Sequence, residues 1–200
     1  MRRTFLRCMG LAGALLCGAA SHAADPPWPA AKPIRLVVPG GAGSGSDIFA
    51  RLIGARLGEA LQQTIYYDNK AGANGIIGND FVAKAPADGY TLLFSNASAV
   101  ALNAVIQPKL PYRTLEDLVP VAQVGAGGVL LVATPDVPAK DVKGFVQYVQ
   151  AHPDELSYGT WGTGSTGNLA MEALKAENRL RISHVPYKTS AQVLAGLGAL

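Results

Sequence analysis

Two glycine-rich loops, at residues 39–47 and 159–167, carry the residue types in this sequence best suited to holding a ligand. Each loop follows a strand-like run and precedes a helix-like one. Glycine permits positive φ and lets a ligand approach the backbone closely, and the first N–H groups of a helix favour an anion. The pattern therefore favours a site for a negatively charged group, although small residues before a helix also serve as ordinary caps and turns.

Two such loops facing one ligand would supply useful affinity without an arginine. A helix dipole contributes about 0.3–1 kcal/mol, and a hydrogen bond to a charged group contributes about 1.5–3 kcal/mol. Several of these together reach the roughly 8 kcal/mol of a micromolar complex. In open α/β sheets, ligands bind at the carboxyl ends of the strands, which is where both loops are expected.

Other kinds of chemistry fit the sequence less well. Residues 162–167 match the dinucleotide fingerprint, but the acidic residue expected about 20 positions later is absent. Residues 163–167 lack the first glycine of a nucleophile elbow. The histidines available as a base, His152 and His184, are interpreted as structural, and two histidines without a cysteine supply a zinc site poorly. We therefore expect no catalysis, no cofactor and no metal.

The alternation of strand-like and helix-like runs predicts a mostly parallel α/β fold. Strands are expected at 34–38, 64–67, 90–94, 119–124, 129–133, 156–158 and 182–185, and helices at 47–61, 76–84, 99–105, 115–118, 142–150 and 168–178. The strand at 119–124 is interpreted as the first crossing out of one α/β unit. The strand at 129–133 is interpreted as the opening of a second.

The first residues have the pattern of an export signal. Three arginines among the first seven residues precede a short apolar run, and residues 21–23 are small enough for cleavage. The apolar run of about ten residues is too short for a bilayer, which requires roughly 20. We expect a signal peptide at 1–23, cut after Ala23 and exported by the general secretory or the twin-arginine route.

Removal of that leader changes the charge of the chain. All 14 acidic residues lie after Ala23 but only 14 of the 17 basic ones do, so the mature chain is nearly neutral. We therefore expect neither nucleic acid nor anionic lipid as a partner. Both cysteines, Cys8 and Cys17, lie in the leader, which predicts no disulfide in the mature chain. Leu16 is larger than a lipoprotein signal requires, so no lipid anchor is expected.

A series of short motifs runs from about Pro33 to the last residue. They are VVP at 37–39, DIFAR at 47–51, NKAGANG at 69–75, IG at 77–78, VAKAPADGYTL at 82–92, LPY at 110–112, YG at 158–159, GTGS at 162–165 and HVPYK at 184–188. This combination resembles the Bug family, the periplasmic solute-binding receptors of tripartite tricarboxylate transporters. The family usually has an aromatic residue in place of Gly40 and often a histidine in place of Asn168.

The resemblance implies a type II periplasmic-binding-protein fold, in which two α/β lobes close on a ligand in the cleft between them. Residues 24–124 would form the first lobe and residues 125–200 an incomplete second lobe, because members of the family extend well past position 200. The apolar, helix-like run at 191–200 also ends without a polar cap, so we expect the sequence to be a fragment.

The resemblance also implies a monomeric receptor in the periplasm that captures a small carboxylate for membrane transporter subunits. The ligand-binding residues carried over are Gly43, Ser44, Gly45, Ser46, Asp47, Ser95, Asn96, Thr163, Gly164, Ser165 and Thr166. Asp47 would orient its loop, since like charges repel, unless the ligand carries an ammonium group. Two alternatives remain open: a periplasmic enzyme on the same scaffold, and a receptor that docks onto a membrane sensor protein.

Overall fold

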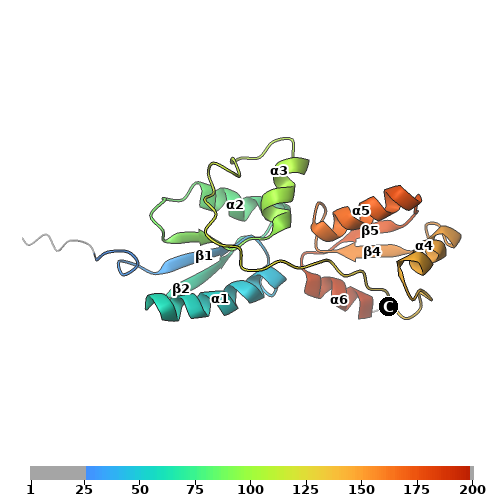
Figure 1. The fold of residues 1–200 in the computed structure, drawn as a ribbon, viewed down its shortest axis with the longest axis horizontal. Helices are drawn as coiled ribbons and strands as arrows, with labels where there is room; N and C mark the ends of the chain where they lie inside the picture. Colours follow the sequence, from blue (N-terminus) through green and yellow to red (C-terminus); the bar gives the residue numbers. More distant parts are fainter. Residues whose placement is uncertain (1–25, 199–200) are drawn as a thin grey trace, which may run out of the picture.

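A computed structural model describes residues 26–198 of this 200-residue chain. The expected signal peptide, its cleavage site and both cysteines lie outside the described residues. No helix in the described part is both long and apolar enough to cross a bilayer. Two α/β units follow one another along the long axis of the molecule (Figure 1).

The first unit contains a parallel three-stranded sheet in the order β2-β1-β3. Its elements are β1 (Ile34–Val38), α1 (Gly45–Leu61), β2 (Ile65–Asn69), the 3-10 turn η1 (Ala73–Gly75), α2 (Ile76–Ala83), β3 (Thr91–Leu93), the π-helical turn η2 (Ser98–Leu102) and α3 (Asn103–Ile106). Helix α1 covers one face of the sheet and α2 the other (Figure 1). Ile34, Val37 and Val38 of β1 are fully buried, as expected for a central parallel strand covered on both faces.

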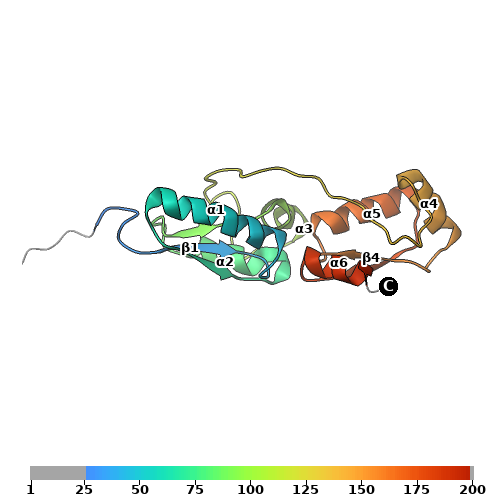
Figure 2. The same cartoon turned by 90° about the horizontal axis from the view of Figure 1, so that it is seen from below.

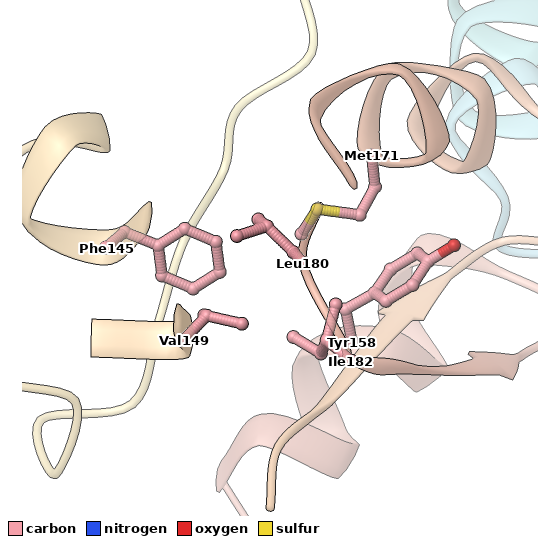
Figure 3. Close-up of a cluster of buried hydrophobic side chains, with 6 residues drawn as sticks. All are labelled: Phe145, Val149, Tyr158, Met171, Leu180 and Ile182. Carbon is pink, nitrogen blue, oxygen red and sulfur yellow. The ribbon is translucent and has the colours of Figure 1, made fainter. Parts of the chain in front are cut away.

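The second unit contains a parallel two-stranded sheet with helices on both sides (Figure 1). Its elements are α4 (Val142–Ala151), β4 (Ser157–Thr160), α5 (Thr166–Asn178), β5 (Ser183–Pro186) and α6 (Ser190–Gly198). Buried side chains from α4, β4, α5 and the segment before β5 converge on one core (Figure 3): Phe145, Val149, Tyr158, Met171, Leu180 and Ile182. This core fixes α5 and β4, the two elements that flank the second glycine-rich loop.

The predicted α/β fold with parallel pairing is confirmed, and most of the expected elements are present with boundaries moved by up to two residues. Helix α5, for example, begins at Thr166 rather than at residue 168. The expected helix at 99–105 is divided into the π-helical turn η2 and the short α3.

The predictions for residues 115–133 are wrong. Residues 114–117 form a turn, and the segments 119–124 and 129–133 are not strands. This stretch instead runs as an extended connection from the first unit to the second (Figure 2). Its β-branched composition suits a strand, but Val121 and Leu130 are 88% and 86% exposed and pair with no neighbouring strand. The expected lobe boundary at 124/125 lies within this connection and stays a prediction.

Candidate ligand-binding loops

The first glycine-rich loop ends in a well-capped helix. The Oγ of Ser44, the N-cap of α1, accepts a hydrogen bond from the Asp47 N–H at 3.3 Å. The N–H of Gly43 donates to the Asp47 carboxylate at 2.9 Å. Gly43 has a φ of 77°, a conformation that a residue with a side chain rarely adopts. Ser44 and Asp47 therefore fix the loop from both sides of the helix start.

The second loop repeats this geometry. Ser165 is the N-cap of α5, and its Oγ accepts from the Asn168 N–H at 3.2 Å. The N–H of Gly164 donates to the Asn168 Oδ1 at 2.9 Å, and Gly164 has a φ of 76°. Each loop thus consists of a left-handed glycine, a capping serine and, three residues after the cap, a side-chain oxygen that holds the glycine amide.

The residue beneath the first loop carries a stable negative charge. Asp47 is 3% exposed, and its carboxylate also accepts hydrogen bonds from Arg51 at 3.0 Å and Asn69 at 3.0 Å. Burial raises the pKa of this carboxyl, but the hydrogen bonds from Arg51, Gly43 and Asn69 outweigh burial and hold the pKa at about 2. These contacts are those of a side chain that orients the loop.

The residue beneath the second loop is neutral and is surrounded differently. The amide nitrogen of Asn168 donates to the Tyr158 hydroxyl at 2.9 Å and lies 3.5 Å from Nδ1 of His184. The Tyr158 and His184 rings stack with their centroids 4.8 Å apart, and the Tyr158 hydroxyl donates to Glu172. Burial raises the pKa of Tyr158, as does its hydrogen bond to Glu172, so the phenol stays protonated.

The remaining expected residues of the first unit lie close to its loop. The amide of Asn96 donates to the Ser46 Oγ at 3.1 Å, and its Oδ1 accepts from the Ala99 N–H at 3.1 Å. The Ser95 hydroxyl oxygen is buried and has no hydrogen-bond partner within the described residues. Among these residues the N–H groups of Gly45 and Ser46 also have no acceptor, as is usual for the first turn of a helix.

Three hydrogen bonds join the second loop and the start of α5 to η1 and η2 of the first unit. The Thr166 N–H donates to the Ser98 Oγ at 3.0 Å, the Ser98 hydroxyl donates to the Thr166 Oγ1 at 3.4 Å, and the Asn74 side-chain amide donates to the Gly164 carbonyl at 3.1 Å. Thr163 is exposed beside them. The sequence analysis missed both Ser98 and Asn74. Asn74 adopts a left-handed backbone conformation with a φ of 50°. Its position between an alanine and a glycine in a turn motif was the one feature of the sequence that could have drawn attention to it.

Two surface pockets, of about 520 and 380 Å³, lie elsewhere in the first unit, at α2 and near α3, and no expected ligand-binding residue lines either. Within residues 26–198, no cluster of three or more histidine, cysteine, aspartate or glutamate side chains could hold a metal ion. The two capped loops are therefore taken as the candidate ligand-binding site.

Residues 49–199 match the family described as the tripartite tricarboxylate transporter family receptor. The chain belongs to this receptor family. The resemblance found in the sequence is thereby confirmed, and receptors of this family are periplasmic solute-binding proteins. In Bordetella pertussis, BugT is 36% identical over 168 residues, covering 84% of this chain and 52% of BugT. A UPF0065 protein of the same species is 34% identical over 196 residues, covering 98% of this chain and 59% of that relative.

Solved receptor structures share the fold. A Rhodopseudomonas palustris protein with adipate is 35% identical with a TM-score of 0.74, covering 86% of this chain and 57% of that one. MatC from Rhodopseudomonas palustris, with bound malate, is 32% identical with a TM-score of 0.76, covering 83% of this chain and 56% of MatC. The receptor chain described here therefore has the type II periplasmic-binding-protein fold and spans a little over half the length of these relatives.

Proposed function

We propose that this protein is a non-catalytic receptor of the periplasm that captures a small carboxylate and delivers it to the membrane subunits of a tripartite tricarboxylate-type uptake system. The observation that carries the proposal is the matched pair of capped loops, one in each unit, with the second loop held against the first unit by Ser98 and Asn74. Each loop opens a helix whose first amides favour an anion. The ligands of the two related structures, adipate and malate, belong to the same chemical class.

In this proposal the two units act as lobes, 24–124 and 125–200, and a ligand held by both favours the closed arrangement. The proposed ligand site comprises the eleven residues expected from the sequence, some of which shape the loops while others donate to the ligand: Gly43, Ser44, Gly45, Ser46, Asp47, Ser95, Asn96, Thr163, Gly164, Ser165 and Thr166. Because the Asp47 carboxylate already accepts from several donors, its role is to hold the loop in place.

The test removes one backbone donor and leaves the helix intact. Gly45 is the first residue of α1, a position that tolerates proline, which has no N–H. Ser44 has φ −69° and ψ 160°, which suits a residue before proline, and a Cβ at position 45 meets no atom within 4 Å. Val142→Pro, at the first residue of α4 after an extended Asp141, is the matched control.

The protein expressed from its complete gene is titrated with malate, adipate and related acids, and with the diamide of malate as an uncharged control. Binding should stabilise it by RT ln(1 + [L]/Kd), about 2.7 kcal/mol at a hundredfold excess over Kd, and the acid should be recovered unchanged. Gly45→Pro should weaken binding roughly 10- to 100-fold, the worth of one hydrogen bond to a charged group, while Val142→Pro leaves binding as in wild type.

Several results would contradict the proposal. Binding of no organic acid, or equal affinity of Gly45→Pro and Val142→Pro, would remove the role of the first loop. Conversion of the acid would favour an enzyme on this scaffold. Co-purification with a membrane sensor protein in place of transporter subunits would favour a sensory role.

A further inference from the structure

A continuous chain of hydrogen bonds runs from the amide of the second loop to a histidine ring. Asn168 is its central link, because its oxygen holds the Gly164 N–H while its nitrogen faces Tyr158 and His184. The other ring nitrogen of His184, Nε2, lies 2.7 Å from the Thr160 Oγ1. Asn168 and Thr160 are 6% and 3% exposed, so water has little access to replace a partner that is lost.

The partners determine which atoms carry the protons. The Thr160 hydroxyl can donate to the Gly162 carbonyl at 3.1 Å while it accepts from Nε2 of His184, an arrangement in which Nε2 carries the proton. The Tyr158 hydroxyl donates to Glu172, so toward Asn168 it can only accept. The Asn168 nitrogen therefore points at Tyr158 and His184, and Nδ1 of His184 must be bare to face it. This arrangement requires a neutral imidazole.

We propose that neutral His184 is a positioning residue for the second carboxylate-binding loop, and that its protonation weakens ligand capture by releasing Gly164. A proton from solvent on Nδ1 would place an N–H against the Asn168 NH₂ group. The simplest relief is rotation of the Asn168 amide, which turns its oxygen toward His184 and its NH₂ toward the Gly164 N–H. The loop then loses the acceptor that holds its left-handed glycine. This inference rests on the proposed function.

The surroundings of the imidazole determine the pH range in which the effect appears. Glu172 and Lys175, both on α5, act on it in opposite senses, and Tyr158 on β4 is neutral. Burial lowers the pKa of His184 below its ordinary value of 6.5, with Lys175 acting in the same direction and Glu172 opposing. The Asp47 pKa of about 2 leaves the charge beneath the first loop unchanged over the pH range in which histidine titrates.

The test measures the affinity for malate by calorimetry from about pH 8 to about pH 4.5 in the protein expressed from its complete gene. Wild type is compared with His184→Gln, which cannot be protonated. His152→Gln is the matched control, because His152 lies at the end of α4 and contacts Tyr148. Below the pKa of His184, wild type and His152→Gln should lose up to tenfold in affinity per pH unit, which is the limit for one linked proton. His184→Gln should lack this component, and the ionisation of malate itself is common to all three.

Nuclear magnetic resonance gives a second readout that needs neither ligand nor variant. The Gly164 amide should titrate with the same midpoint as the His184 ring, and the neutral ring should carry its proton on Nε2. A proton on Nδ1, or a Gly164 amide that ignores the titration of His184, would overturn the inference. So would equal pH dependence in all three proteins, or an affinity that rises in acid through attraction to the imidazolium. In each of these cases carboxylate binding persists, whereas failure of every acid to bind at any pH defeats the proposed function itself.

Discussion

Replacement of Asp47 by asparagine tests how the first loop is held. The carboxylate meets donors alone: the Gly43 N–H, the Arg51 guanidinium and the Asn69 amide. Asparagine keeps one oxygen but places an NH₂ group against at least one of these donors. A buried donor left without an acceptor costs about 1–3 kcal/mol. The change is nearly isosteric, so packing is not disturbed.

The pKa of Asp47 supplies an independent magnitude. A fall from the ordinary value of 3.8 to about 2 corresponds to ~2.5 kcal/mol of stability for the ionised form. The Arg51 side chain is 49% exposed, so solvent screens part of that interaction, and we expect a loss of about 2 kcal/mol in the variant. Because the folded-state pKa is lowered, this stability is fully present above about pH 4 and is lost as the pH falls through about 2.

The assay is urea unfolding of the protein expressed from its complete gene, at about pH 7 and again near pH 2.5. Asp47→Asn should lower the free energy of unfolding by about 2 kcal/mol at the higher pH and by clearly less at the lower one. Asp154→Asn is the control, since Asp154 forms an exposed ion pair with Arg181, which is worth roughly 0–1 kcal/mol. Equal losses in the two variants at neutral pH, or an Asp47→Asn loss that does not change with pH, would refute the reasoning.

Two further predictions concern the contacts between the units. Gly43→Ala and Gly164→Ala both place a side chain at positive φ, at a cost of about 1–2 kcal/mol, but only the Cβ at position 164 would lie 2.8 Å from a residue of the other unit, Ile106. Calorimetric titration should therefore show a larger loss of carboxylate affinity for Gly164→Ala than for Gly43→Ala. Equal losses would contradict a close approach of the two units. Asn74→Gly removes the hydrogen bonds of the Asn74 amide to the Gly164 carbonyl and to Asn103 within the first unit without backbone strain, and should weaken binding about fivefold; unchanged affinity would show that the bond to Gly164 is irrelevant to closure.

The elements that follow hydrophobic periodicity could be predicted from the sequence. β1 is a β-branched run ended by Pro39, and α1 begins at a capping serine with an acid three residues later. Both signals are local, so the two elements were expected, although the start of α1 was placed at residue 47 rather than at Gly45. The same holds for the second unit, where Ser165 and Asn168 open α5.

Predictions failed where structure depends on a distant partner. The segments 119–124 and 129–133 have strand composition, but a strand exists only when another strand pairs with it, and composition does not name that strand. The contacts between the two units were missed for the same reason. Asn74 and Gly164 are 90 positions apart, and Ser98 and Thr166 are 68 positions apart. A single sequence does not indicate which residues so far apart in the chain are in contact.

The identity of the residue beneath each loop follows from what surrounds it. Both loops require a side-chain oxygen three residues after the capping serine, and either aspartate or asparagine supplies one. Beneath the first loop every neighbour donates, so a carboxylate is satisfied and an amide is not. Beneath the second, Tyr158 and His184 accept, so the NH₂ group of Asn168 has partners that a carboxylate would repel. The same loop geometry is thus held in the first unit by Asp47, which stays ionised near neutral pH, and in the second unit by the neutral Asn168, which faces the titratable ring of His184.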